Sequence, residues 1–263
     1  MVILMKSILF TGARSGIINK VAWKLLDDYY LYITVHTESE LEVVEDKFKD
    51  YNNVQCFKLD ITDGNDRQKL QDLDIDILVS NAAIGESGSI ADIDIDKIRN
   101  NFEVNVFCNF EVVQLVLKKM IEKGSGKVIM MSSLAGIIPI PFLGSYCATK
   151  ASIIKLSECL NMELKLLPSS IDVCLIEPGL YATGFNRLML DKKYEYMDVS
   201  SYFDNQINLI RNSENIFLLL FERKRLDSIV NKIIKCIKAD KVKRVYRAPF
   251  LQKVFAKFYV FFS

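Results

Sequence analysis

The sequence predicts an α/β protein in which helices cover both faces of a doubly wound parallel sheet. Apolar segments of strand length alternate with amphipathic segments of helix length along most of the chain. Some strand segments are apolar almost throughout, such as Ile75–Val79, which is typical of parallel strands buried on both faces. No linker-like stretch and no internal repeat divides the 263 residues, so we expect a single domain over residues 1–263.

Strands and helices follow one another in turn from the start of the chain. The predicted strands are Ile3–Phe10, Leu31–His36, Val54–Leu59, Ile75–Ser80, Lys127–Ser132 and Ile171–Glu177. The predicted helices are Ile17–Tyr29, Glu38–Lys49, Asn65–Asp72, Ile95–Lys123 and Ser145–Leu167. Ligands of such sheets bind outside the carboxyl ends of the strands. The residues just after each strand are therefore the candidates for function.

The composition excludes several classes of protein. The 34 basic and 33 acidic side chains nearly cancel, so no net charge attracts the chain to nucleic acid, and we expect no nucleic-acid partner. Half of the residues are apolar and a quarter are charged, which excludes a disordered or fibrous chain. The longest apolar runs, such as Ile216–Phe221, are too short to span a bilayer.

The histidine and cysteine content limits metal and redox chemistry. His36 is the single histidine, so a zinc enzyme with several histidine ligands is excluded, and we expect no metal site. The six cysteines form no C-x-x-C pair. We interpret them as small buried residues of a chain kept in a reducing compartment. Because Lys6 interrupts the first apolar run, we interpret that run as a strand and not a signal peptide, and expect a cytoplasmic protein.

A glycine-containing turn follows the first predicted strand. Gly12 and Gly16 stand between that strand and a helix, in the run Thr11–Ile18. Glycines at such a turn let backbone N–H groups approach a pyrophosphate at the positive end of the helix. A simple turn with a helix cap would have the same appearance, so this motif alone is a modest indication of a dinucleotide site.

A phenol and an ammonium group stand one helical turn apart at the start of the predicted helix 145–167. The spacing of Tyr146 and Lys150 places both side chains on one face of the helix. A phenol has a reference pKa of about 10, and a nearby ammonium lowers it toward neutrality. Ser133 ends the preceding strand, where its hydroxyl would reach the same substrate oxygen as Tyr146. Without the other motifs, Tyr146 and Lys150 would be interpreted as an ordinary surface pair, and Ser133 as a turn residue.

Two asparagines add to this pattern. Asn81 follows the fourth predicted strand, where it is either a turn residue or part of a ligand site. Asn105 lies inside the predicted helix 95–123, where asparagine is unfavourable and has no capping role. Either function or a satisfied core amide would explain it.

Together these residues resemble the short-chain dehydrogenase/reductase family from about Ile3 to Phe185. The family's T-G-x-x-x-G-x-G motif aligns with Thr11–Ile18, and its N-N-A-G segment with Ser80–Ala83. Its helix asparagine, serine and Y-x-x-x-K motif fall on Asn105, Ser133, Tyr146 and Lys150, and its P-G segment falls on Pro178 and Gly179. Each motif is weak alone, but six in order and each after the right strand are strong.

The resemblance implies a Rossmann-type fold and hydride transfer between a nicotinamide cofactor and an alcohol/carbonyl pair. Tyr146 would be the acid/base, Lys150 would lower the phenol pKa and hold the ribose, Ser133 would polarise the substrate oxygen, and Asn105 would hold a water. The implied cofactor-binding residues are Gly12, Arg14, Ser15, Gly16, Ile17, His36, Asp60, Ile61, Asn81, Ala82, Tyr146, Lys150, Pro178, Gly179 and Thr183. It also implies a homodimer or homotetramer.

Two departures bear on the cofactor. Ile18 replaces the third glycine of the motif, so its side chain must push the helix outward or point elsewhere. No carboxylate ends the second strand to accept from the ribose 2′-OH of NAD, and Glu38 comes slightly later. Arg14, with His36 and Thr37, would meet a 2′-phosphate. We therefore expect NADP in preference to NAD, with NAD as the alternative.

The last third of the chain is the least regular. Residues 185–225 are rich in aromatic side chains, and by resemblance they form the substrate lid, which suits a lipophilic alcohol or carbonyl. A helical pair packed on the core is the alternative. Residues 241–263 are basic and aromatic, so this tail would rest on a membrane surface, or form a strand and helix closing the pocket or a subunit contact.

The function we expect is that of an NAD(P)-dependent oxidoreductase of small alcohols and carbonyls. One rival is a catalytically idle dinucleotide-sensing or partner-binding protein of the same fold, which Ile18 would support. A sugar-nucleotide epimerase or dehydratase, which shares Y-x-x-x-K, is a second rival, although the chain is short for the additional substrate domain.

Overall fold

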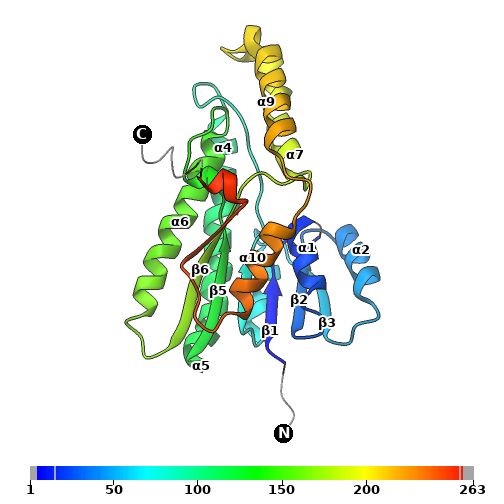
Figure 1. Ribbon diagram of the computed structural model, residues 1–263, viewed down its shortest axis with the longest axis vertical. Coiled ribbons are helices and arrows are strands. Elements are labelled where there is room, and N and C mark those ends of the chain that lie inside the picture. The colour runs from blue at the N-terminus through cyan, green and yellow to red at the C-terminus, as the bar shows by residue number, and fades with distance from the viewer. Residues whose placement is uncertain (1–4, 15, 255, 257–263) are drawn as a thin grey trace.

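The fold is a seven-stranded parallel sheet with helices on both faces, as Figure 1 shows. The computed structural model describes residues 5–14, 16–254 and 256. The strand order is β3-β2-β1-β4-β5-β6-β7, so the order reverses beside β1. This is the doubly wound arrangement of a Rossmann-type fold. The fold class predicted from the sequence is therefore confirmed.

The observed strands follow the predicted ones closely. They are β1 (Ser7–Phe10), β2 (Tyr30–Val35), β3 (Val54–Lys58), β4 (Ile77–Ser80), β5 (Ser125–Met131), β6 (Ser170–Pro178) and β7 (Val245–Ala248). The first predicted strand began at Ile3, which lies outside the described residues. β7 pairs with β6 along Leu175–Pro178, so part of the region 241–263 forms a final strand.

Alternate side chains of each strand feed two separate apolar cores. On β1, Ile8 and Phe10 belong to the core under α1 (Gly16–Trp23), α2 (Glu38–Phe48) and α10 (Asp227–Lys238). Leu9 belongs to the core under α5 (Asn109–Lys123) and α6 (Gly144–Leu164). All three side chains are fully buried. The alternation explains why the strands are apolar on both faces.

The predicted helix 95–123 is interrupted in the middle. It consists of α4 (Ile95–Phe102), a π-helical segment (Glu103–Cys108) and α5. Such π-helical turns are rare and often lie at functional sites. Asn105 lies inside this segment, which gives a local structural reason for an asparagine in mid-helix.

Short helices complete the chain. They are α3 (Gly64–Gln68) with a 3-10 turn (Lys69–Asp72), a 3-10 turn after β5 (Leu134–Gly136), α7 (Phe185–Asp191), α8 (Tyr194–Ser200), a 3-10 turn (Asp204–Gln206) and α9 (Ile207–Phe221). Residues 250–254 are also helical. Among the residues described, no helix is both long and apolar enough to cross a bilayer.

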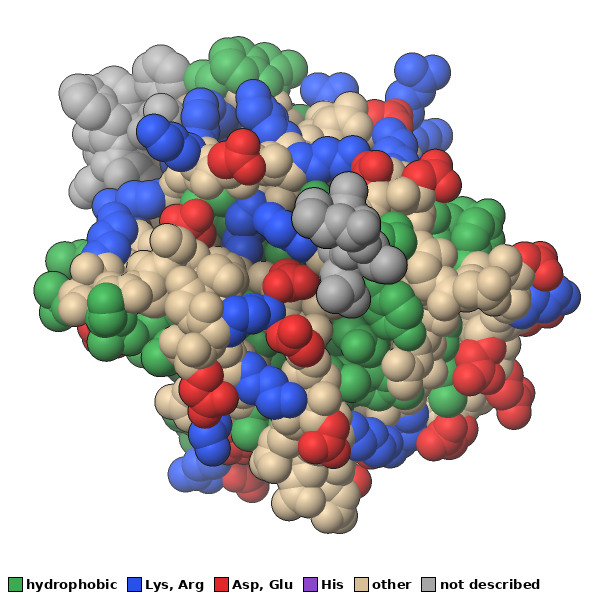
Figure 2. All heavy atoms as spheres, turned by 90° about the horizontal axis from the view of Figure 1, so that it is seen from below, with side chains coloured by type: hydrophobic (Ala, Val, Ile, Leu, Met, Phe, Trp, Pro, Cys, Tyr) green, Lys and Arg blue, Asp and Glu red, His purple; other side chains and the backbone are tan. Residues whose placement is uncertain are grey.

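The two ends of the sheet differ in character. Figure 2 shows the end from which the strands start, where acidic and basic side chains are interspersed and basic ones gather along the upper edge. At the other end, where the strands finish, α7 and α9 rise beyond the sheet (Figure 1). Thr11, Asn81 and Ser133 follow strand ends on this second side, and Tyr146 and Lys150 lie at the start of α6.

Candidate active site

A cavity of about 950 Å³ opens at the carboxyl ends of the strands. Nearly all the residues singled out by the sequence line it: Gly12, Arg14, Gly16, Ile17, His36, Asp60, Ile61, Asn81, Ala82, Ser133, Tyr146, Lys150, Pro178, Gly179 and Thr183. Asn105 does not, and Ser15 lies outside the described residues. One continuous cavity thus joins the glycine turn to the Tyr146–Lys150 pair.

Hydrogen bonds from Thr11 and Asn81 hold the glycine turn against the end of β4. The Thr11 hydroxyl accepts from the N–H groups of Asn81 (2.8 Å) and Ala82 (3.0 Å). The Asn81 amide donates to the Gly12 carbonyl at 2.9 Å. Gly12 has φ of +65°, and a Cβ on it would lie 3.0 Å from the Ala82 Cα. Glycine is required here for both conformation and space.

Ile18 points into the core beneath α1. Its side chain is 1% exposed and belongs to the apolar core shared by β1, α1 and α10. The preceding glycine, Gly16, keeps a positive φ of +68° and faces Thr183. The side chain of Ile18 therefore fills core volume that a glycine would leave empty.

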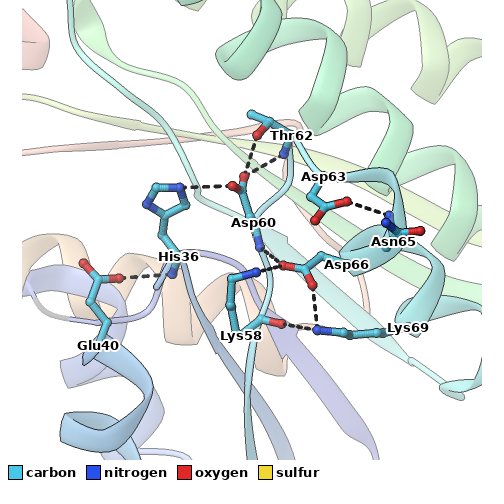
Figure 3. Close-up of polar contacts among 9 residues, drawn as sticks. All are labelled: His36, Glu40, Lys58, Asp60, Thr62, Asp63, Asn65, Asp66 and Lys69. Carbon is cyan, nitrogen blue, oxygen red and sulfur yellow. Dashed lines mark hydrogen bonds and ion pairs between the residues drawn. The ribbon is translucent and has the colours of Figure 1, made fainter. Parts of the chain in front are cut away.

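Polar residues after β2 and β3 line the end of the cavity away from Tyr146. Figure 3 shows the contacts among these residues. His36 Nε2 lies 3.3 Å from the Asp60 carboxylate. The hydroxyl and N–H of Thr62 donate to the same carboxylate at 2.7 and 2.9 Å. Although burial acts in the opposite direction, the Thr62 hydrogen bonds and His36 lower the pKa of Asp60. The carboxylate is therefore ionised at neutral pH.

Asp66 holds the loop that follows β3 in place. Its buried carboxylate accepts from the Asp60 N–H at 2.8 Å and pairs with Lys58 and Lys69 at 2.7 and 2.6 Å (Figure 3). Burial would raise its pKa, but these hydrogen bonds lower the pKa of Asp66 to about 2. Sequence reasoning did not single out this residue, because its role depends on lysines from two elements.

Glu40 is the second residue that sequence reasoning missed. Its carboxylate accepts from the His36 N–H at 3.0 Å and pairs with Arg14 at 3.0 Å. Thr37 caps α2 and accepts from the Glu40 N–H. Thr37-Glu38-Ser39-Glu40 has the S/T-x-x-E spacing of a capping box, which turns the third-position glutamate back toward the helix start. That spacing was a usable signal, and it places a carboxylate beside Arg14.

Ser133 and Tyr146 lie together at the other end of the cavity. Ser133 begins the 3-10 turn after β5, accepts from the Ala135 N–H and donates to the Pro178 carbonyl at 3.4 Å. Tyr146 is 7% exposed, and its ring lies 5.9 Å from that of Phe185. Burial raises the pKa of the Tyr146 phenol, and the neighbouring Ser133 side chain lowers it by less.

Lys150 lies one turn beyond Tyr146 on α6, and it is 3% exposed. Its Nζ donates to the Met131 carbonyl at 3.2 Å and lies 5.5 Å from the centre of the Tyr146 ring. Burial lowers the pKa of Lys150 to about 8. The sequence-based expectation was that Lys150 lowers the phenol pKa. In this geometry burial dominates, and the pKa of Tyr146 is raised instead.

Asn105 faces the protein interior. Its amide accepts from the Ile84 N–H at 2.8 Å and donates to the Ile84 carbonyl at 2.8 Å. It also donates to Thr149 at 3.3 Å. These contacts tie the π-helical segment to the chain after β4 and to α6. A water-holding role for its side chain stays a prediction.

The loop after β6 is held by a residue from the C-terminal region. Gln252 Oε1 accepts from the Leu180 N–H at 2.7 Å, and its Nε2 donates to the Phe221 carbonyl at 2.7 Å. A side chain on Gly179 would collide with the same Gln252 oxygen. Gln252 lines the cavity, although no local sequence pattern marks it.

The cavity lining around Tyr146 is mostly apolar, although Asn186, Arg223 and Gln252 also contribute to it. Its apolar residues come from the turn after β5, α7, α9 and the C-terminal helical residues: Leu134, Ile138, Ile140, Leu143, Phe185, Met189, Phe217, Leu220, Phe221 and Leu251. Three polar groups, on Ser133, Tyr146 and Lys150, therefore meet a wall that favours hydrocarbon.

The fold and the site place this protein in the class of oxidoreductases with a dinucleotide-binding fold. Comparison with known proteins identifies its family. The short chain dehydrogenase family matches residues 6–193, and the chain belongs to this family. It is 33% identical over 175 residues to the probable short-chain type dehydrogenase/reductase VdlC of Helicobacter pylori, covering 64% of this chain and 62% of that protein. It is 27% identical over 260 residues to the 3-ketodihydrosphingosine reductase of Bacteroides thetaiotaomicron, covering 95% and 90%.

Solved structures share the fold. A short chain dehydrogenase/reductase of Burkholderia phymatum in complex with NAD superposes with a TM-score of 0.81 at 18% identity, covering 97% of this chain and 92% of that one. A short-chain dehydrogenase of Sphingobium yanoikuyae in complex with NADPH gives 0.73 at 20% identity, covering 98% and 95%.

Restoring the motif glycine at position 18 should destabilise the protein. Ile18→Gly removes a buried side chain and adds the entropic cost of glycine in a helix, so we expect a loss of about 3 to 5 kcal/mol in the free energy of unfolding. Lys20→Gly on the exposed side of α1 is the control and should cost only about 1 kcal/mol. Urea unfolding measures both. Equal losses would show that Ile18 contributes no packing.

Lys150 should make stability depend on pH in a defined window. The folded lysine has a pKa of about 8 and the unfolded one 10.5, so folding disfavours the ammonium. Both states are protonated below pH 8, where the penalty is complete. Between about pH 8 and 10.5 the unfolded state binds more protons, and stability rises with pH.

Replacing Lys150 with methionine should remove this penalty. We expect Lys150→Met to be more stable than the wild type by roughly 1 to 3 kcal/mol at pH 7, with the difference shrinking toward pH 10.5. Urea unfolding of both proteins across this range measures it. A constant difference would contradict the depressed pKa.

Proposed function

We propose that this protein is an NAD(P)-dependent oxidoreductase that reduces the carbonyl group of a lipophilic substrate. The observation that carries the proposal is the single cavity that joins the glycine turn to Ser133, Tyr146 and Lys150. The match to the short chain dehydrogenase family agrees with it.

The residues present fit a dinucleotide cofactor. Gly12, Gly16 and Ile17 line the cavity at the start of α1, and the N–H groups of a helix start are suited to bind a pyrophosphate. Asp60 and Ile61 would hold the adenine end, Lys150 the ribose beside the nicotinamide, and Thr183 the carboxamide. When bound, the cofactor supplies the hydride that the chain itself does not carry.

The side chains of the cavity then handle the proton. Tyr146 donates its phenolic proton to the substrate oxygen, and the Ser133 hydroxyl donates a hydrogen bond to the same atom. Burial raises the phenol pKa, so Tyr146 carries its proton at neutral pH. The Lys150 ammonium stabilises the phenolate that remains after proton transfer.

The apolar lining of the cavity supports a lipophilic substrate. Three relatives carry names of the same kind: 3-ketodihydrosphingosine reductase, NADPH-dependent 3-dehydrocapnine reductase and very-long-chain 3-oxoacyl-CoA reductase. All of these names describe reduction of a keto group. A ketone close to a long alkyl chain would place its oxygen at Tyr146 and its chain along α7 and α9.

Two further expectations belong to this proposal. Exposed apolar side chains on the segment 103–108 and on α5 and α6, among them Phe107 (56%), Ile121 (42%) and Met162 (64%), support pairing of two copies through these helices. A cytoplasmic location agrees with the free cysteines.

The idle-protein alternative loses its main support, because Ile18 is accommodated in the core.

Removing the phenolic hydroxyl should separate catalysis from binding. For Tyr146→Phe we expect kcat to fall by about 10²- to 10⁴-fold, since the general acid is lost, with cofactor affinity nearly unchanged. Oxidation of NADPH with a panel of long-chain ketones and nicotinamide fluorescence on binding measure the two effects. Tyr202→Phe, 80% exposed, is the control. Near-wild-type turnover of Tyr146→Phe would remove this residue from the mechanism.

The preference for NADP depends on Arg14. We expect the wild type to favour NADPH, and Arg14→Ala to lower kcat/KM for NADPH by about 10- to 100-fold with a smaller effect for NADH. Glu40→Gln frees Arg14 from its ion pair and should raise kcat/KM for NADPH. Steady-state kinetics with both cofactors decide this, and a wild type that prefers NADH would overturn the expectation.

A further inference from the structure

Helix α9 ends in a run of apolar side chains that the protein does not bury. Ile216, Leu219 and Leu220 are 57%, 83% and 69% exposed. Phe217 and Phe221 are also close to half exposed, and their rings lie 5.0 Å apart. In Figure 1 helix α9 extends away from the sheet, and its C-terminal end, which carries these side chains, is the end nearer the sheet. None of these side chains belongs to the two main cores.

Two other segments extend the same exposed surface. Leu188 on α7 is 68% exposed, and Phe250 and Leu251 after β7 are 71% and 66% exposed. Arg187 of α7 donates to Asn215 of α9, and Gln252 donates to the Phe221 carbonyl. The three segments therefore meet at the end of α9. We call the apolar side chains there the α9 surface: Leu188, Ile216, Phe217, Leu219, Leu220, Phe221, Phe250 and Leu251.

Positive charge borders the α9 surface. Arg223, Lys224 and Arg225 follow α9 directly, and all three are exposed. Glu214 pairs with Lys193, whereas Glu222 keeps its charge while it accepts from the neutral Asn186 amide. The three cations outnumber Glu222 and Asp227, the two acids of residues 222–227. The border therefore carries an excess of cations.

The α9 surface also forms one side of the cavity. Phe217, Leu220, Phe221 and Leu251 are both exposed and part of the cavity lining. A hydrophobic molecule held against the α9 surface would thus reach the cavity without passing through water.

We propose that the α9 surface docks on an anionic lipid bilayer and takes its substrate from it. Apolar side chains next to a cluster of arginine and lysine are the composition of an interfacial membrane-binding segment. A second copy fits less well, because a two-fold interface would bring the two Arg223–Arg225 clusters together and close the cavity. Docking itself rests on this surface alone, and only the origin of the substrate rests on the proposed function.

This location differs from the one expected from the sequence. The basic and aromatic tail 241–263 was the predicted membrane contact, and residues 257–263 lie outside those described. The described residues put the main apolar area on α9, with Phe250 and Leu251 as its only contribution from the tail.

Vesicle flotation of the full chain tests the proposal. Wild type should float with vesicles of phosphatidylcholine and phosphatidylglycerol at low salt, and weakly with phosphatidylcholine alone. Lys224→Glu with Arg225→Glu should weaken binding to the anionic vesicles by roughly fivefold or more per cation. About 1 M salt, where the Debye length is about 3 Å, should act similarly. Ile216→Glu with Leu219→Glu should abolish flotation at either salt concentration.

Matched variants control for charge and exposure. Leu166→Glu removes an apolar side chain that is 86% exposed at the end of α6, and Lys20→Glu with Lys47→Glu reverses two exposed cations on α1 and α2. Both should float like the wild type. Circular dichroism establishes that each variant is folded.

Three results would overturn the proposal. The first is a wild type that does not float, and the second is an Ile216→Glu/Leu219→Glu variant that floats like the wild type. In the third, light scattering shows that this variant splits a dimer while no form of the protein floats, so a second copy covers the α9 surface. Reduction of a short, water-soluble ketone should be unaffected by Ile216→Glu/Leu219→Glu, so a failure of docking is distinguishable from a failure of the proposed function.

Discussion

The close approach of the β1 and β4 ends is the constraint on which the site depends. The Thr11 hydroxyl accepts hydrogen bonds from two N–H groups of the chain after β4. Gly12 has no side chain, and a Cβ placed on it would lie 3.0 Å from the Ala82 Cα. The order of the strands reverses beside β1, so this contact lies at the switch point. If the two ends were farther apart, the glycine turn would no longer face the same cavity as Tyr146.

Burial governs the chemistry at the other end of the cavity. It raises the pKa of the Tyr146 phenol and lowers that of the Lys150 ammonium, so it moves the two pKa values, which are nearly equal in water, apart. The phenol stays a proton donor at neutral pH, and the lysine is the group that titrates near it. In the proposed function, the apolar lining that would accept a lipophilic substrate is the same lining that desolvates Tyr146 and Lys150. Substrate choice and proton transfer would then be coupled through one desolvation.

The sequence predicted the sheet well, because parallel strands that are buried on both faces are apolar at nearly every position. It predicted most motif residues of the site because they follow strand ends, and it predicted Tyr146 and Lys150 because their spacing places both on one helix face. It missed the π-helical break at Asn105, since both helical states have nearly the same amphipathic pattern. Glu40 was overlooked although a capping box marks it. Gln252 could not be found, because its contact with Leu180 spans 72 positions and leaves no local pattern.

The way in which α9 is held explains how it keeps an exposed apolar end. Among the described residues, only Ile207 and Leu218 of this helix are buried. Polar contacts do the rest: Lys193 and Tyr194 bind Glu214, and Asn186 binds Glu222. Hydrogen bonds and ion pairs fix orientation without covering hydrocarbon. Because much of the anchoring is polar, Ile216, Leu219 and Leu220 stay largely exposed beside the cavity.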